Sequence, residues 1–264
     1  MEIPIYQIDA FTGRLFAGNP AAVCPLTAWL PDATMQAIAA ENNLSETAFF
    51  VAAEDGAAED GYELRWFTPT VEVPLCGHAT LAASFVIMTQ LRPGAERVRF
   101  RTRSGALEVV RRGDLFELDL PASPPRPVET PESLVAALGK VPREVLAAKS
   151  YLAVFADEAE VAALAPDMGA VAALDRDGVI VTAPGREADF VSRYFAPAAG
   201  IPEDPVTGSA HCVLTPYWAK RLGRSALRAR QISARGGELF CEDRGDRVAV
   251  TGRAVCYLEG RIRV

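Results

Sequence analysis

The sequence contains very few lysines and histidines. Among 264 residues there are three lysines (Lys140, Lys149 and Lys220) and two histidines (His78 and His211). A pyridoxal phosphate enzyme needs a lysine for its Schiff base, and none of the three lies in a motif. Two histidines are too few for a histidine-rich zinc or iron site. We therefore expect no cofactor and no resident metal.

Other familiar signatures are absent as well. Neither of the common glycine-rich phosphate loops occurs. The longest apolar stretch, near residues 81–88, is far too short to span a bilayer, and no signal peptide is expected at the N-terminus. The five cysteines are odd in number and form no CxxC pair, which favours a reduced, cytoplasmic setting. Because the net charge is −7, we expect neither nucleic acid nor an anionic membrane as a partner.

The composition that remains is that of a globular protein, with 50% hydrophobic and 23% charged residues. Apolar β-branched runs alternate with stretches rich in Ala and Leu. The runs predict strands over residues 3–8, 48–51, 62–67, 98–100, 107–110, 115–120, 178–182 and 248–250. Helices are predicted over 33–41 with Asp32 as N-cap, and over 79–90, 132–138 and 158–164.

Two parts of the sequence repeat each other. Residues 65–69 (RWFTP) precede Gly77-His78-Ala79, and residues 193–197 (RYFAP) precede Gly208-Ser209-Ala210. Each part reads as a strand, a loop and the start of an apolar helix. We therefore predict an internal duplication, with two similar α/β domains facing each other across a cleft. A proline cluster over 121–131 predicts a linker, so the domains are expected at 1–120 and 128–264, with the final strand possibly crossing back.

The two predicted helix starts are candidate anion sites. A helix N-terminus leaves backbone N–H groups unpaired and carries partial positive charge, and glycine allows a ligand to approach them. Gly77-His78 and Gly208-Ser209 could therefore each hold a substrate carboxylate. Each could equally be an ordinary tight turn, but their matching positions favour the functional interpretation.

Four side chains near these motifs could carry chemistry. Glu46 lies where a polar loop enters an apolar strand, and partial desolvation suits a carboxylate to proton shuttling. The alternative is a surface glutamate at a strand start. Asp204 is either part of an Asp-Pro turn or a second titratable group near a helix start. His78 follows a helix-starting glycine, where the helix dipole opposes its protonation. Cys76 precedes that glycine, and a thiol beside a helix N-terminus can be acidic.

Five motifs occur in an order that resembles the phenazine-biosynthesis PhzF-like family of isomerases. They are residues 9–12 (DAFT) with 18–23 (GNPAAV), 43–49 (NLSETAF), 67–69 (FTP) with Glu72, 76–80 (CGHAT), and 203–211 (EDPVTGSAH). The resemblance covers most of the chain. It implies an α+β fold of the diaminopimelate-epimerase type. In that fold, two similar lobes, each a curved and mostly antiparallel sheet around a central helix, have the active site between them.

The resemblance also implies a function. It implies a cofactor-free isomerase, a homodimer, and a small substrate with a carboxylate, such as a dihydro-hydroxyanthranilate or another amino-acid-like compound. The family's acid/base glutamate falls on Glu46. Its substrate-contacting histidine, aspartate and serine fall on His78, Asp204 and Ser209. Asn19, Gly77 and Gly208 complete the predicted substrate-binding set.

Two alternatives remain open at this stage. One is a racemase or epimerase of an amino or hydroxy acid that uses Cys76 together with Glu46 or another partner. Relatives of the fold use two opposed cysteines, but no cysteine precedes the second glycine motif here. The other alternative is a small-molecule-binding protein without catalysis. The sequence predicts the chemistry more closely than it predicts the substrate or the pathway.

Overall fold

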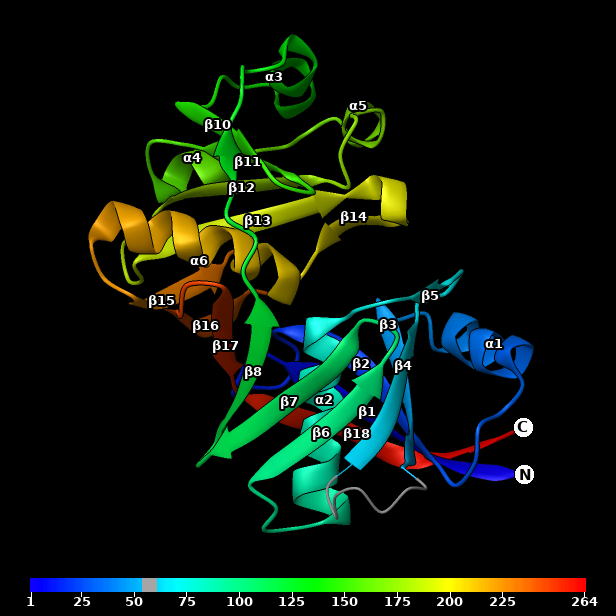
Figure 1. The fold of residues 1–264 in the computed structure, drawn as a ribbon. Helices are drawn as coiled ribbons and strands as arrows, with labels where there is room; N and C mark the ends of the chain where they lie inside the picture. The colour runs from blue at the N-terminus through cyan, green and yellow to red at the C-terminus, as the bar shows by residue number, and fades with distance from the viewer. Residues whose placement is uncertain (54–60) are drawn as a thin grey trace. The chain divides into compact units, whose positions relative to one another are not determined.

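Residues 1–53 and 61–264 are described by the computed structural model, and they divide into two units (Figure 1). Unit 1 consists of Met1–Asp119 together with Thr251–Val264, and unit 2 consists of Leu120–Val250. The chain therefore leaves unit 1 once, completes unit 2, and returns to unit 1 with its last residues.

Unit 1 is built on a mixed sheet. Its strands are β1 (Glu2–Ala10), β2 (Asn19–Leu26), β3 (Glu46–Ala52), β4 (Gly61–Phe67), β5 (Glu72–Val73), β6 (Arg97–Thr102), β7 (Gly105–Arg112), β8 (Leu115–Pro121) and β18 (Ala254–Arg263). Only β2–β3 and β4–β6 are parallel among the pairs formed within the described part of this unit. The last strand, β18, pairs with the first strand, β1, from Glu2↔Arg263 to Ala10↔Ala254.

Helix α2 (Gly77–Val86) is the central helix of unit 1. It packs against β1, β2 and β3, and eight of its ten residues are buried. This confirms the predicted helix that is hydrophobic on most sides, although it begins at Gly77 rather than Ala79. A turn of π-helix, η1 (Ile87–Leu91), extends it until Pro93 and Gly94 follow.

Helix α1 (Asp32–Asn42) contacts β3 and β4, and Met35 and Ile38 pack with Phe49 in a hydrophobic cluster beneath it. The predicted N-cap was wrong at this helix. Pro31 occupies the cap position without a side-chain hydrogen bond, and Asp32 is the first helical residue. The carboxylate of Asp32 instead pairs with Arg65 at 2.9 Å.

Unit 2 has a similar inventory. Its strands are β9 (Arg126–Pro127), β10 (Glu144–Ala147), β11 (Tyr151–Val154), β12 (Val179–Pro184), β13 (Phe190–Ala196), β14 (Ile201–Asp204), β15 (Ala226–Gln231), β16 (Gly237–Asp243) and β17 (Arg247–Gly252). Its helices are α3 (Glu132–Leu138), α4 (Glu158–Ala162), α5 (Met168–Ala172), η2 (Pro197–Ala199) and α6 (Gly208–Leu222). Helix α6 packs against β15 and β16, and the short helices α3, α4 and α5 contribute to a separate apolar cluster.

The proline-rich segment after Leu120 is bonded to unit 2 rather than running free as a linker. Pro216 lies inside α6 and has no N–H to donate to the carbonyl of Cys212, four residues earlier. That carbonyl accepts a hydrogen bond from the backbone N–H of Ser123 instead, at 3.0 Å. A little further along the chain, β9 pairs with β10. The carbonyl that the helix-interior proline leaves without a helical partner is therefore satisfied by the proline-rich segment.

The two units share one topology. In unit 1 the order β2–β3–β4–β6–β7 alternates parallel and antiparallel pairing, and β11–β12–β13–β15–β16 repeats that order in unit 2. A side-chain contact repeats too. Ser104 Oγ donates to the carbonyl of Pro74 at 2.7 Å, and Ser233 Oγ donates to that of Pro205 at 2.7 Å. The repeated sequence motifs therefore lie at corresponding places of two similar folds.

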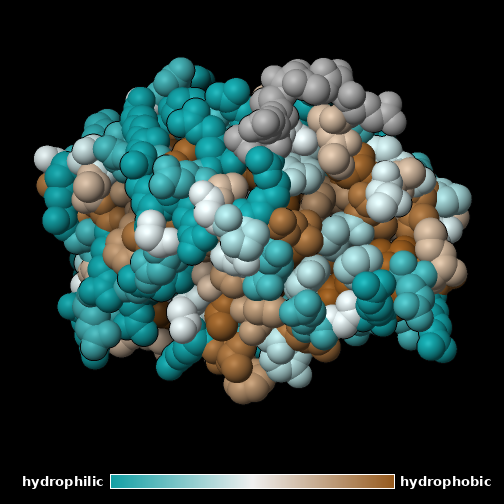
Figure 2. All heavy atoms as spheres, turned by 90° about the horizontal axis from the view of Figure 1, so that it is seen from below, coloured by the Kyte–Doolittle hydropathy of each residue, from teal (hydrophilic) through white to brown (hydrophobic). Residues whose placement is uncertain are grey.

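The surface carries dispersed apolar groups. Figure 2, which views the protein from below, has hydrophobic residues interspersed among hydrophilic ones. Phe16 and Tyr257 are both exposed, and their rings meet edge to face with centroids 5.6 Å apart. Across residues 1–53 and 61–264, no helix is both long and apolar enough to cross a membrane.

Candidate active site

Asn19 and Glu46 lie at the same end of two neighbouring strands in the unit 1 sheet. Asn19 is the first residue of β2 and Glu46 the first of β3, and these parallel strands align Ala21 with Glu46. Asn19 is fully buried, while the side chain of Glu46 is 13% exposed. Glu46 is therefore neither a surface residue nor fully sealed from solvent, which suits a group that exchanges protons.

His78, in the first turn of α2, connects these residues. Its Nε2 lies 3.3 Å from Glu46 Oε2, and its Nδ1 lies 3.2 Å from Asn19 Nδ2. Cys76 Sγ is 3.4 Å from the same Nδ1. Because an amide nitrogen and a thiol are both donors, Nδ1 is the acceptor, which leaves the ring proton on Nε2 toward Glu46.

Burial determines the charge of this histidine. The side chain of His78 is 4% exposed, and desolvation lowers its pKa to about 3. At neutral pH the imidazole is uncharged, so its contact with Glu46 is between a dipole and a carboxylate rather than an ion pair. The sequence predicts this resistance to protonation from the helix dipole, whereas the cause in the structure is burial.

The loop before β2 holds Asn19 by a backbone conformation that requires glycine. Gly18 has φ of +66°, and a Cβ added there would lie 2.1 Å from the carbonyl oxygen of Ala10. The buried carboxylate of Asp9 accepts the backbone N–H of Phe16 at 2.9 Å, which anchors the other end of the loop. The positive φ of Gly18 therefore allows the chain to place its neighbour Asn19 at the start of β2.

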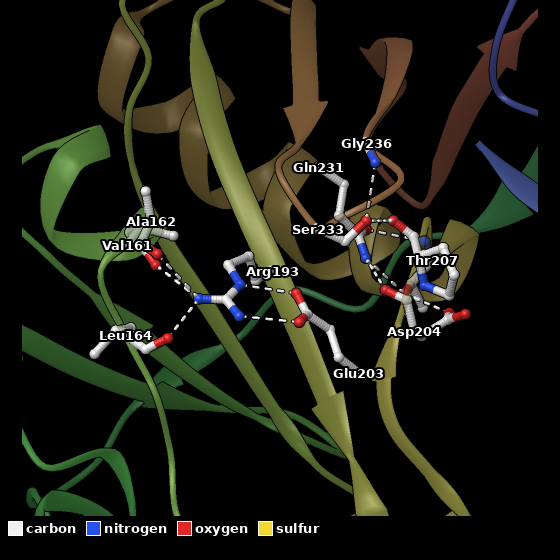
Figure 3. Close-up of polar contacts among 11 residues, drawn as sticks. Val161, Ala162, Leu164, Arg193, Glu203, Asp204, Thr207, Gln231, Ser233 and Gly236 are labelled. Atoms are coloured by element: carbon white, nitrogen blue, oxygen red, sulfur yellow. Dashed lines mark hydrogen bonds and ion pairs between the residues drawn. The ribbon is translucent and has the colours of Figure 1, made fainter. Parts of the chain in front are cut away.

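In unit 2, Asp204 belongs to a buried network (Figure 3). Thr207 Oγ1 donates to Asp204 Oδ2 at 2.5 Å. Gln231 Nε2 donates to the backbone carbonyl of Asp204 at 2.7 Å, and its Oε1 accepts the backbone N–H of Thr207 at 2.9 Å. Gln231 therefore fixes both ends of the turn between β14 and α6, and with them the Asp204 carboxylate.

An arginine clamp, meaning an arginine that binds one carboxylate through two nitrogens, holds β14 at the residue before Asp204. Arg193 of β13 binds the carboxylate of Glu203 through two nitrogens, at 2.7 and 2.9 Å. Its Nη1 also donates to the backbone carbonyls of Val161 and Leu164, as Figure 3 shows. Bidentate contacts of this kind fix geometry as well as charge, so β14 is held immediately before Asp204.

Neither of the two helix starts predicted as anion sites has a side-chain cap. Cys76 and Thr207 occupy the N-cap positions of α2 and α6 in an extended conformation, without a cap hydrogen bond from their side chains. Gly77 opens α2 and is partly exposed, while Ser209 in the first turn of α6 is exposed. Both starts are therefore able to receive a carboxylate.

The second histidine, His211, is structural. It is fully buried in α6, and its Nδ1 donates to the carbonyl of Thr207 at 2.8 Å. Its Nε2 has no hydrogen-bond partner in the part of the chain that the structure describes, and burial lowers its pKa to about 4. His211 therefore supports the N-terminal turn of α6 as a neutral ring.

Comparisons with known proteins show to which family the chain belongs. The sequence matches the family of phenazine biosynthesis-like proteins (PhzC-PhzF) over residues 8–260. An uncharacterized isomerase of Pseudomonas aeruginosa is 53% identical over 264 residues, with 100% of both chains covered. A PhzF-family protein from Enterococcus faecalis has a crystal structure with a TM-score of 0.95 and 46% identity, again over 100% of both chains. The chain belongs to the phenazine biosynthesis-like family.

Membership of this phenazine biosynthesis-like family confirms the predicted class of enzyme and the predicted fold. Its close relatives carry the name isomerase, so the protein is an enzyme of an isomerase family. A hydroxyproline epimerase from Agrobacterium vitis, 10% identical, has a TM-score of 0.62 over 99% of this chain and 92% of its own. At that identity the likeness concerns the fold alone, which is the α+β, two-lobe epimerase-like fold.

The sequence predicted most of the polar residues of the candidate site, but Gln231 and the role of Thr207 were missed. Asn19, Glu46, Cys76 and His78 come together in unit 1. Asp204, Gly208 and Ser209 follow one another in unit 2. Gln231 had a recognisable signal: it occupies the inward position of a strand where Leu227 and Ala229 precede it, so a polar residue stands where an apolar one is expected.

Proposed function

We propose that the protein is a cofactor-independent isomerase that moves a proton on a small substrate bearing a carboxylate, with Glu46 as acid and base. The observation that supports this is the cluster of Glu46, His78 and Asn19 at the start of α2. One partly buried carboxylate, one neutral imidazole and one buried amide suit proton transfer between carbon atoms better than hydrolysis or redox chemistry.

In this mechanism Glu46 takes a proton from an acidic C–H bond and returns it to another carbon of the same conjugated system. His78, with its proton on Nε2 beside Glu46, donates a hydrogen bond to a polar group of the substrate. Because burial keeps the pKa of His78 at about 3, the ring stays neutral and does not compete with Glu46 as a base.

Each unit carries polar groups to which we assign a part in substrate binding. The backbone amides of Gly77-His78 and of Gly208-Ser209 are offered to carboxylate oxygens, since neither helix start has a side-chain cap. Asp204, held by Thr207 and Gln231, orients an amino or hydroxyl group of the substrate. The substrate class is therefore an amino-acid-like or dihydro-anthranilate-like acid.

A screen in D₂O tests this proposal while the substrate is still unidentified. Small carboxylic acids and cyclic amino acids are incubated with the enzyme, and mass spectrometry follows deuterium entering a carbon position. Glu46→Gln should abolish most of the incorporation. The matched control is Glu117→Gln, since Glu117 has a similarly buried side chain (14% exposed) that pairs with Arg112. Exchange by Glu46→Gln at the wild-type rate would overturn the assignment.

A Cys76-dependent racemase is the second candidate, and the contact of Cys76 Sγ with His78 favours it. In the matching position of unit 2, however, Thr207 stands at the N-cap, and its hydroxyl binds Asp204. A mechanism with two thiols has no second thiol at that position. Cys76→Ser should therefore retain most of the exchange activity; if Cys76→Ser abolishes exchange and Glu46→Gln does not, the racemase is the better description.

The quaternary structure and compartment form part of the same proposal. We infer a homodimer, supported by the exposed aromatic pair Phe16 and Tyr257, and a reducing cytoplasmic setting, supported by five cysteines without a disulfide among the described residues. Light scattering on the purified protein tests the first inference. A monomer at all concentrations would refute it.

A further inference from the structure

A group of potential metal ligands lies at the start of α2. Within residues 1–53 and 61–264, Glu46, Cys76 and His78 form the one set of three such side chains whose ligand atoms all lie within 4.8 Å of one another. The set combines a carboxylate, a thiol and an imidazole. These are the three ligand types that zinc uses in proteins, at about 2.0–2.3 Å from the ion.

The spacing of these atoms fits a shared cation. Ligands at about 2.0–2.3 Å from one ion can be at most roughly twice that distance apart, so separations within 4.8 Å close onto it with small side-chain shifts. Cys76 Sγ is already 3.4 Å from the imidazole, and Glu46 Oε2 is 3.3 Å from it. The scarcity of histidine excludes a histidine-rich site, but it does not exclude a site with a single imidazole.

His78 supplies the independent observation. Its ring is almost completely buried, and among the described residues Nε2 forms no hydrogen bond, although it lies 3.3 Å from Glu46 Oε2. A buried polar nitrogen without a hydrogen bond is costly, and Nε2 can bind a cation once the ring proton has moved to Nδ1. Asn19 lies 3.2 Å from the other ring nitrogen, and its amide, turned so that the oxygen faces Nδ1, would accept the Nδ1 proton as second-layer partners of metal-bound histidines do.

We propose that Glu46, Cys76 and His78 bind one thiophilic divalent cation of the Zn²⁺ class. On binding, the Cys76 thiol releases its proton to solvent and becomes a thiolate ligand, while the imidazole proton moves from Nε2 to Nδ1, so that the neutral ring offers the Nε2 lone pair. Three protein ligands leave a fourth position for water. The cation occupies the Glu46 carboxylate, so it inhibits the isomerisation; this consequence, unlike the binding itself, rests on the proposed function.

The test uses Cd²⁺ as a probe, because a cadmium–thiolate bond gives a charge-transfer absorption in the ultraviolet. The reduced, chelator-treated and desalted full-length protein is titrated with Cd²⁺ and, by calorimetry, with Zn²⁺. We expect one equivalent to bind with the absorption band and to raise the Tm. Cys76→Ser should abolish the band, and His78→Asn and Glu46→Gln should each weaken binding by at least about 10- to 100-fold.

Cys212→Ser is the matched control. Cys76 and Cys212 are each 6% exposed and each lies beside a long-helix start, but Cys212 Sγ donates to the carbonyl of Gly208 and lies outside the three-ligand set. Cys212→Ser should retain the full band. A band that survives in Cys76→Ser, or that is unchanged in both His78→Asn and Glu46→Gln, would overturn the proposal. Circular dichroism of each variant separates loss of the site from loss of the fold, and no outcome depends on finding the substrate.

Discussion

The two units share a framework and differ in the groups it carries. Arg65 binds Glu72 through two nitrogens and lies over the ring of Phe67. In unit 2, Arg193 binds Glu203 and lies over the ring of Phe195 in the same way. The strand that ends in aromatic-x-Pro and the following short strand are thus built alike in both units.

At the chemical positions the likeness ends. The pairs Thr47↔Phe67 and Val179↔Phe195 align β3 with β12, so the position of Glu46 in unit 1 is that of Gly178 in unit 2. A Cβ at Gly178 would lie 2.5 Å from the carbonyl oxygen of Phe195, so no side chain can stand there. The duplicated frame therefore offers the proposed acid/base carboxylate a place in unit 1 only, and the proposed function gives unit 2 the roles of binding and orientation.

The largest expected effect comes from substitutions that test the different roles proposed for the two units. Glu46→Gln should lower the rate of isotope exchange by about 10²–10⁴-fold, since it removes the proton-accepting oxygen and keeps the shape. Asp204→Asn in unit 2 should instead weaken ligand binding and turnover together, as expected of an orienting group. Exchange kinetics and ligand titration measure the two. If Asp204→Asn alone lost turnover with binding unchanged, the division of roles would be wrong.

The second prediction compares the two arginine clamps. Arg193→Ala should destabilise the protein by about 3–5 kcal/mol, because Glu203 and several backbone carbonyls lose their partner. Arg65→Ala should cost less, because Glu72 keeps Arg103 at 2.7 Å. Urea denaturation monitored by circular dichroism gives both values. Equal losses would show that the carbonyl contacts of Arg193 contribute little.

A smaller effect is expected at Gln231. Gln231→Leu should cost about 1–3 kcal/mol, because the backbone N–H of Thr207 and the carbonyl of Asp204 lose their buried partner. By strand register its counterpart in unit 1 is Thr102, which is less buried and bonds the nearby carbonyl of Gly105. Thr102→Val should therefore be nearly neutral. A Gln231→Leu protein with the Tm of wild type would contradict the network's role.

The smallest effect concerns pH. Burial lowers the pKa of His78 to about 3 and that of His211 to about 4, both from 6.5. Between pH 6.5 and about 4 the unfolded chain binds more protons than the folded one, so stability falls as pH falls. His211→Asn removes one of the two groups and should reduce this loss by up to about 1.4 kcal/mol per pH unit. An unchanged slope of unfolding free energy from pH 6 to 5 would refute the buried, neutral state of His211.

Sequence reasoning predicted the elements whose pattern is local. The buried helix α2 and the aromatic strands before each helix start were recognisable from periodicity, because a nearly all-apolar helix has few alternatives. The cap of α1 was missed, since Asp32 pairs with the charge of Arg65, which is distant in sequence. Gln231 was missed for the same reason: its three contacts are more than twenty residues away. Local chemistry is readable from sequence, whereas networks closed by the fold are not.

The pairing of β1 with β18 has a consequence for how the protein is made. The N-terminal amino group and the carbonyl of Val264 are hydrogen-bonded, and the first strand has the last strand as its neighbour along its whole length. During synthesis, β1 waits for its partner until β18 has left the ribosome, and such distant contacts form slowly. Any arrest or proteolytic loss within the last strand leaves the edge of β1 open. Joining the adjacent ends and reopening the chain at an exposed turn would place these two strands next to each other in sequence, and that rearranged protein should fold faster.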